Sequence, residues 1–294
     1  MVRESERARL GVPLKAGSPQ TQRVRRRAAR GSGLSSRPGA LVVNADDWGR
    51  DRATTDCIGD CVALGAVSSV SAMVFMQDSE RAAKIAQQRG ICVGLHLNFT
   101  TPFSGSCSAK LSDKQHKLGA YLRWSAARAI FHPGLAECFE YVVKAQMDEF
   151  QRLYRESPSR VDGHHHVHLC ANVLLGGLLE AGVVVRPHFS YERGEKHVHT
   201  VYRAVTRFLL KRRYRATDYL FSLTPLEQPG RLEGIFALSD NSVVEVETHP
   251  IEPEEYQFLT SGEIFRVAGG IPIASGPAIP GYRQPGVTTV TPTP

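Results

Sequence analysis

Ala40-Leu41-Val42-Val43-Asn44-Ala45 is the stretch that decides the fold, and the acidic pair Asp46-Asp47 follows it directly. A short, continuous apolar run of this kind predicts a strand that is buried on both faces, as in a parallel sheet. Residues 52–64 then repeat apolar side chains at helical spacing. The folded part of the chain therefore opens with a β–α unit.

The alternation of strand and helix patterns continues along the chain. We expect further strands at Val67–Met76, Ile91–Leu97, Val183–Arg186 and Ser242–Thr248, and helices at residues 78–89, 136–155, 171–181, 199–213 and 254–267. Such repeats predict an α/β fold, (β/α)-barrel-like with mainly parallel strands and an active site at the strand C-terminal ends. The polar segment between Asn98 and His116 is predicted to be a long loop, of the kind that often forms a lid.

The net charge of +7 comes from the start of the 294-residue chain. Residues 1–40 hold ten Arg or Lys against Glu4 and Glu6, which leaves a charge of about −1 for the remainder. Residues 1–39 lack hydrophobic periodicity and are expected to be a disordered basic extension, and residues 40–294 a single domain. An organelle transit peptide is one interpretation of the extension, but its acidic residues favour a dispensable segment from an upstream start codon.

The composition also indicates a compartment. The chain has no run of about 18 apolar residues that would span a membrane, and its start has no apolar core of a secretory signal. The six cysteines form no C-x-x-C pair and no disulfide-like framework. Reduced thiols in the cytoplasm are the simplest interpretation.

Polar side chains follow several of the expected strands at their C-terminal ends. The pair Asp46-Asp47 ends the first strand, His96 lies in the third, and Arg186 and His249 end two later ones. The run His164-His165-His166-Val167-His168 comes directly after Arg160–Gly163. Because the carboxyl ends of parallel strands meet at one edge of a sheet, these side chains are expected to gather into one site.

Two adjacent carboxylates at Asp46 and Asp47 can be explained in two ways. One Asp before a helix is a common N-cap. A second one beside it adds repulsion unless a cation or a proton compensates. One carboxylate could thus bind a metal ion while its neighbour remains a free base, and we favour this functional interpretation.

The histidines extend the metal hypothesis. Taken alone, His96 is most simply a hydrogen-bonded core residue, and the His run a surface tract that binds metal adventitiously. Together with Asp47 and His164, however, His96 completes a set of two imidazoles and one carboxylate that leaves positions open for water and substrate. If the run starts as a strand, His164, His166 and His168 share one face, and not all of them can bind the same ion. The set suits Zn²⁺, Mg²⁺, Mn²⁺ or Fe²⁺.

Two strand-end residues have both a structural and a functional interpretation. His249, followed by Pro250, is either part of a simple turn or a general acid for a leaving amine. Arg186 either orients a carboxylate through hydrogen bonds or forms a surface ion pair.

Four motifs occur in an order that resembles one family. They are Asn44-Ala45-Asp46-Asp47-Trp48-Gly49, Gly94-Leu95-His96-Leu97, Asp162-Gly163-His164-His165-His166-Val167-His168 and Glu247-Thr248-His249-Pro250. The chain resembles the YdjC-type carbohydrate deacetylases over roughly residues 40–265; this family includes chitooligosaccharide deacetylases and relatives linked to hopanoid biosynthesis. The resemblance implies a (β/α)-barrel-like domain over residues 40–294 and a metal-dependent hydrolase that removes the N-acetyl group from an acetamido sugar.

The resemblance also implies roles for individual residues. Asp47, His96 and His164 match the metal ligands, for one divalent ion that we expect to be Mg²⁺ or Zn²⁺. Asp46 matches the catalytic base and His249 the acid. His166, His168 and Arg186 are expected to support the ligands or bind substrate. The implied partner is an N-acetylated carbohydrate, with no nucleic acid and no membrane span, and a homodimer is compatible with this interpretation.

Other functions remain open from the sequence. The metal site could hydrolyse a different bond, such as a phosphoester or another amide. The chain could also be a sugar- or metal-binding relative without catalysis, although the intact Asp46-Asp47 pair argues against that. A nucleic-acid interface on the basic extension and the helix around Lys211–Arg215 is the least favoured, because such charge is usually solvated surface.

Overall fold

The computed structural model describes residues 39–190 and 200–274, all within the unit Pro38–Pro294. The expected basic extension and the last residues of the chain lie outside these ranges, so the prediction of two regions stays a prediction. Seven parallel strands form one sheet in the order β5-β4-β3-β2-β1-β7-β6. The strands are β1 (Ala40–Trp48), β2 (Ser69–Ala72), β3 (Val93–Leu97), β4 (Arg160–Gly163), β5 (Val184–Val185), β6 (Tyr219–Ser222) and β7 (Val243–Thr248).

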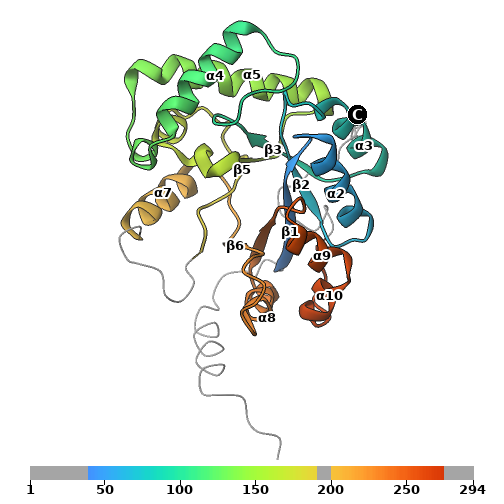
Figure 1. Ribbon diagram of the computed structural model, residues 1–294. Coiled ribbons are helices and arrows are strands. Elements are labelled where there is room, and N and C mark those ends of the chain that lie inside the picture. Colours follow the sequence, from blue (N-terminus) through green and yellow to red (C-terminus); the bar gives the residue numbers. More distant parts are fainter. Residues whose placement is uncertain (1–38, 191–199, 275–294) are drawn as a thin grey trace, which may run out of the picture. The chain divides into compact units, whose positions relative to one another are not determined.

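Helices surround the strands, with α4, α5 and α7 at one side of Figure 1 and α2, α3, α9 and α10 at the other. The α-helices are α2 (Arg52–Ala63), α3 (Ser79–Arg89), α4 (Ala109–Leu122), α5 (Ala136–Tyr154), α6 (Ala171–Gly176), α7 (Thr200–Arg213), α8 (Arg231–Phe236), α9 (Pro253–Thr260) and α10 (Glu263–Ala268). Short 3-10 helices are η1 (Ser125–Ala129), η2 (Pro133–Leu135), η3 (His164–Leu169) and η5 (Ala237–Asp240). This arrangement confirms the predicted α/β, barrel-like fold with parallel strands.

The sheet curls so that its two edge strands approach each other. Backbone hydrogen bonds join Val185 N to Arg215 O at 2.8 Å and Arg215 N to Val183 O at 3.0 Å. Further along, Ser190 N donates to Leu220 O at 2.8 Å. These bonds link β5 to the segment before β6 and the segment after β5 to β6, without a regular ladder, so the barrel has a seam on this side.

The apolar run at residues 40–45 is the centre of the sheet. All nine residues of β1 are buried, and the strand pairs with β2 on one side and β7 on the other. Its outward side chains, such as Val43, pack in the main apolar core beneath the helices. Burial on both faces explains why the sequence of this strand is apolar apart from Asn44 until Asp46 begins the site.

The inner surface of the barrel is polar. Four strands each contribute two residues that are two positions apart, and the side chains of these residues contact one another on the inner face of the sheet. They are Asn44 and Asp46 from β1, Ser69 and Ser71 from β2, Arg160 and Asp162 from β4, and Glu245 and Glu247 from β7. Side chains that alternate along a strand point to opposite faces, so one face is apolar and the other carries charge.

Several predicted elements differ from the structure. The segment between Asn98 and His116 is not wholly loop, because α4 begins at Ala109 with Ser108 as its N-cap. The helix expected over 254–267 is two helices, interrupted at Ser261-Gly262, where Gly262 has φ of 83°. The second strand is confined to Ser69–Ala72, and two further elements, β6 and α8, are absent from the sequence-based expectation.

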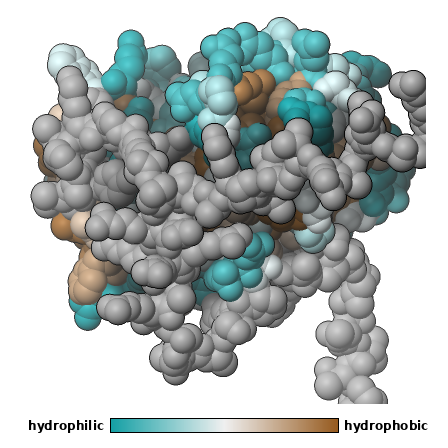
Figure 2. Space-filling view, turned by 90° about the horizontal axis from the view of Figure 1, so that it is seen from below, coloured by the Kyte–Doolittle hydropathy of each residue, from teal (hydrophilic) through white to brown (hydrophobic). Residues whose placement is uncertain are grey.

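The visible surface of the described residues is mostly hydrophilic in the view of Figure 2, with hydrophobic residues in small areas. Among the described residues, no helix is both long and apolar enough to cross a membrane.

Candidate active site

A break in β1 allows two adjacent carboxylates to face the same site. The pairing of β1 with β2 shifts register between Ala45 and Trp48, and Asp47 has φ of 67°, in the left-handed region. Asn44 and Asp46 point into the barrel by the normal alternation, and the left-handed turn at Asp47 brings its carboxylate to the same side. A non-glycine residue held in this region is uncommon, and such strain tends to occur at functional sites.

Asp47, His96 and His164 form a buried cluster at the C-terminal ends of three strands. Oδ1 of Asp47 lies 3.0 Å from Nδ1 of His164 and 3.4 Å from Nε2 of His96. These donor atoms all lie within 4.8 Å of one another. Oδ1 of Asp47 and Nε2 of His96 are buried and make no hydrogen bond. Buried polar atoms normally have partners, so two such atoms pointing at one spot fit a cation there.

The outer atoms of these residues are held by the protein. Nδ1 of His96 is 2.7 Å from Oδ1 of Asp162, and Oδ2 of Asp47 accepts a hydrogen bond from Arg50 at 3.0 Å. A carboxylate on the far nitrogen of an imidazole fixes its tautomer, so that the other nitrogen is presented to a metal. Asp162 thus orients His96 with Nε2 toward the cluster.

The cluster attracts positive charge. Burial opposes a charged imidazole, yet the carboxylates of Asp46, Asp162 and Asp47 raise the pKa of His96 to about 10. Burial likewise favours a neutral acid, but the adjacent imidazoles of His164 and His96 hold the pKa of Asp47 far below its ordinary value. A divalent cation would satisfy the same demand for positive charge.

Two buried arginines support the carboxylates from inside the barrel. Arg186 donates to both oxygens of Asp46, at 2.6 and 2.7 Å, and to Glu247 at 2.9 Å. Arg160 donates to Asp162 at 2.8 Å and also pairs closely with Glu245. With Asp47 and its partner Arg50, the network holds five carboxylates against three guanidinium groups, a further reason for a cation at this site. The surface ion pair considered for Arg186 is wrong, since its side chain is fully buried.

The histidine run does not continue the strand. It forms η3, and His165 and His166 have φ values of 57° and 56°. The expectation that His164, His166 and His168 share one face as on a strand is therefore wrong. Each imidazole has its own surroundings, because the left-handed residues turn the chain back on itself.

Only His164 of the run lies in the Asp47 cluster. His165 points outward, with Nδ1 3.0 Å from the hydroxyl of Thr100. His166 places Nε2 3.4 Å from Glu247, and its ring meets the edge of Phe189 with centroids 4.7 Å apart. His168 is fully buried, with Nε2 3.0 Å from the carbonyl oxygen of Arg186. His166 borders the site, and His168 supports the backbone that carries Arg186.

His249 lies on the open side of the site. Its side chain is 36% exposed, and Nε2 is 3.9 Å from Glu247. Its backbone N–H donates to Glu255 at 2.6 Å, which fixes the turn after β7. Donor atoms of His249, Glu247 and Asp46 lie within 4.8 Å of one another. His249 and Glu247 thus form a second group of donor atoms, which includes Asp46, the neighbour of Asp47.

Sequence reasoning missed the charged residues inside the barrel. Asp162 and Glu247 belong to the four motifs but carry no predicted role, and Arg160 and Glu245 are not among the predicted site residues. The signal is the spacing of two: charged residues at 160 and 162, and at 245 and 247, alternate with apolar ones inside buried strands. A charge in such a position has to be paired.

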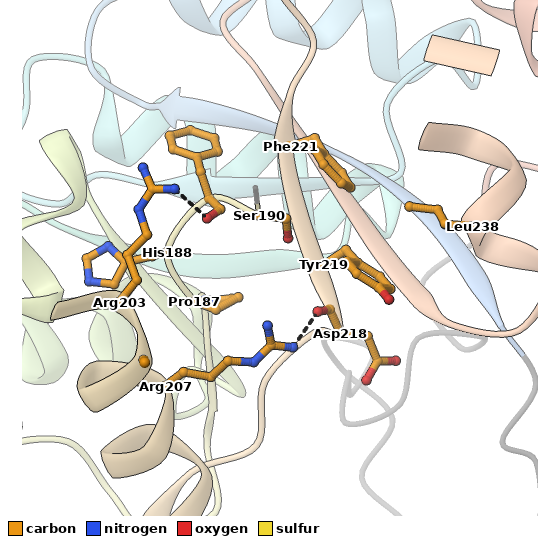
Figure 3. Close-up of a pocket in the computed structure, with 11 residues that line it drawn as sticks. Pro187, His188, Ser190, Arg203, Arg207, Asp218, Tyr219, Phe221 and Leu238 are labelled. Carbon is orange, nitrogen blue, oxygen red and sulfur yellow. Dashed lines mark hydrogen bonds between the residues drawn. The ribbon is translucent and has the colours of Figure 1, made fainter. Parts of the chain in front are cut away.

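Two cavities are lined by neighbours of the site residues: His165, which follows His164, and Phe189, which contacts His166. One, of about 420 Å³, is lined by His165, Thr100, Arg123, Arg128 and part of α4. The other, of about 390 Å³, lies at the seam between β5 and β6, where Arg203 and Arg207 of α7 face Tyr219 and Phe221 (Figure 3). Both arginines there donate to backbone carbonyls, of Phe189 and Asp218.

The chain matches a known protein family over most of its length. The family described as YdjC-like protein matches residues 40–266. The chain belongs to this family, and the four motifs of the site all fall inside the matched range.

Curated relatives cover part of the chain. A carbohydrate deacetylase from Mus musculus is 34% identical over 140 residues, which is 45% of this chain and 44% of the relative. One from Danio rerio is 31% identical over 135 residues, 45% of this chain and 43% of the relative. A chitooligosaccharide deacetylase from Yersinia pestis (strain Pestoides F) is 33% identical over 138 residues, which is 45% of this chain and 52% of the relative. The matches span about half the length of these relatives.

A solved structure shows the same fold. It is that of a proposed cellobiose-phosphate cleavage protein from Enterococcus faecalis V583, with a TM-score of 0.56 and 20% sequence identity. The match covers 81% of this chain and 97% of that protein.

Proposed function

We propose that this protein is a metal-dependent hydrolase that removes the N-acetyl group from an acetamido sugar or oligosaccharide. The observation that carries the proposal is the buried cluster of Asp47, His96 and His164, with two unpartnered ligand atoms, next to Asp46, which itself groups with Glu247 and His249. The names of the relatives, carbohydrate deacetylase and chitooligosaccharide deacetylase, support this choice of reaction.

One divalent ion fits the cluster. Two imidazoles and one carboxylate are typical of a catalytic Zn²⁺ site, whereas Mg²⁺ prefers oxygen ligands. We therefore favour Zn²⁺ over Mg²⁺ for Asp47, His96 and His164. When bound, the ion would supply a Lewis acid that polarises the acetamide carbonyl.

The remaining residues of the site would transfer protons and orient the groups that take part in the reaction. We assign Asp46 as the base that accepts a proton from the attacking water; two hydrogen bonds from Arg186 fix its carboxylate. Oxygens of a carboxylate keep free lone pairs beside such a pair, so Asp46 can still act as an acceptor. We assign His249, on the open side, as the acid that donates a proton to the leaving amine. His166 narrows the site between Glu247 and Phe189.

Acetate release from a panel of N-acetylglucosamine compounds tests the reaction. The wild type should release acetate, and the Asp46→Asn and His249→Ala variants should release far less. A phosphorylated sugar in the same panel separates the alternative, because phosphate is the product only of phosphoester hydrolysis. Phosphate release without acetate would overturn the proposal in favour of that reaction.

The cysteines indicate the cellular compartment of the protein. All six cysteines lie in the described part of the chain and are free thiols. Free thiols are typical of a reducing compartment, and on this ground we propose a cytoplasmic location.

A further inference from the structure

A short turn beside the active site exposes large apolar side chains. The turn follows α4 and spans Arg123–Phe131. The exposed fractions are 77% for Trp124, 60% for Ile130 and 38% for Phe131. Single exposed apolar residues are ordinary, but three within eight positions, one of them tryptophan, mark an interaction surface.

Hydrogen bonds fix the backbone of the turn. Ala127 N donates to Trp124 O at 3.0 Å, and Ile130 N donates to Ala127 O at 3.2 Å. The hydroxyl of Tyr121 donates to the carbonyls of Ala127 and Ile130, both at 3.0 Å. The backbone that carries Trp124 and Ile130 is therefore held by the protein while their side chains face outward.

Further contacts tie the turn to the catalytic region. Arg128 donates to the carbonyl oxygen of His165 at 3.1 Å. At the other end, His132 exchanges two hydrogen bonds with Asn172, of 2.9 and 3.0 Å. Arg123 and Arg128 also line the 420 Å³ cavity that reaches His165. The turn that carries the exposed apolar side chains thus contributes two arginines to the wall of this cavity.

The charged side chains of the turn are all basic. From Arg123 to Leu135 the sequence holds two arginines and one histidine and has no acidic residue. None of the residues that line the adjoining cavity is acidic either. Exposed Trp and Ile flanked by arginines are typical of segments that enter the interface of a membrane while basic groups meet lipid phosphates.

We propose that the turn Arg123–Phe131 docks on the surface of an anionic lipid bilayer, with Trp124 and Ile130 inserted at headgroup depth. A second copy of the chain is a poorer occupant. A two-fold interface centred on this turn would place Arg123 and Arg128 of both copies together, without a carboxylate from either turn. Docking by this turn would bring the cavity at His165 close to the lipid surface. The inference goes beyond the proposed hydrolysis and does not depend on it.

Tryptophan fluorescence provides a direct test, because the chain has two tryptophans and Trp48 is fully buried. The full-length protein is mixed with vesicles of phosphatidylcholine and phosphatidylglycerol, and with phosphatidylcholine alone. Anionic vesicles should shift the emission of Trp124 to the blue, and brominated lipids should quench it. Higher salt should weaken both effects. The basic extension has no tryptophan, so vesicle binding without a shift would come from elsewhere and would overturn the proposal.

Two variants that keep both tryptophans complete the test. Ile130→Ser should weaken vesicle partitioning by about tenfold, the effect of withdrawing one large aliphatic side chain from an apolar environment. Phe265→Ser is the matched control, because Phe265 is 44% exposed on α10, far along the chain from the turn, and should bind like the wild type. Equal partitioning of wild type and Ile130→Ser would contradict the proposal. Light scattering that shows a dimer lost in Ile130→Ser, with vesicle binding unchanged, would assign the turn to a second copy instead.

Discussion

Replacing Asp162 with asparagine tests how the buried network prepares the proposed metal site. Oδ1 of Asp162 holds His96 at 2.7 Å, and Oδ2 accepts from Ser71 at 2.6 Å and from Arg160 at 2.8 Å. An asparagine at this position can keep either the contact to His96 or the contacts to Ser71 and Arg160, but not both. If its oxygen stays on His96, its NH₂ group faces the donors of Ser71 and Arg160.

Both the metal affinity and the stability of Asp162→Asn can be worked out from these contacts. Loss of a carboxylate that orients a ligating imidazole typically weakens metal binding by about 10- to 100-fold. Breaking one partner of a buried ion pair costs about 3 kcal/mol of unfolding free energy, the low end because Arg160 keeps Glu245. For a domain of this size that corresponds to a fall of roughly 6–12 °C in Tm.

The assay is competition of the protein with a chromophoric chelator for Zn²⁺, together with thermal unfolding. Asp148→Asn is the matched control, because Asp148 is 61% exposed and pairs with Lys144 on the surface of α5. This control should change neither property. A folded Asp162→Asn protein with wild-type Zn²⁺ affinity would refute the assignment of Asp162 as the residue that orients His96.

Two further predictions concern catalysis and pH. Asp46→Asn should lower acetate release by about 10²- to 10⁴-fold with little change in Zn²⁺ affinity, as expected of a base that is not a ligand; steady-state kinetics and the chelator assay measure both, and loss of Zn²⁺ binding would contradict this role. Burial lowers the pKa of His168 to about 3, below the value near 6.5 of an unfolded chain, so its contribution to stability is complete above pH 6.5 and is lost as the pH falls. Between pH 7.5 and 5 the wild type should therefore lose about 2 kcal/mol more unfolding free energy than His168→Gln in urea titrations. Equal losses would show that His168 is not held neutral.

The elements that could be predicted from the sequence are those whose pattern has a single structural cause. The run at residues 40–45 is mostly apolar because β1 is buried on both faces, and residues 243–248 are recognisable because valines alternate there with glutamates. α4 is not predicted because Gln115 interrupts its apolar stripe. Gln115 is buried there and bonds to the backbone of Thr101, a contact that depends on the tertiary fold.

The candidate site was predictable in its members but not in its geometry. Strand-end positions in the sequence are enough to group Asp47, His96 and His164. The bidentate pair of Arg186 with Asp46 joins residues 140 positions apart, and no local pattern encodes it. The left-handed backbone at His165 and His166 could not be predicted either, because no sequence pattern shows that β4 ends at Gly163 and that the chain turns directly after it.

Metal content and acetate release, measured on the same protein samples, test the central claim most directly. The purified wild type should hold about one divalent ion per chain, lose acetate release when a chelator removes that ion, and regain it on addition of Zn²⁺. Asp47→Ala should hold no ion and stay inactive after the addition. Acetate release that persists in the metal-free wild type, or in Asp47→Ala, would contradict the account.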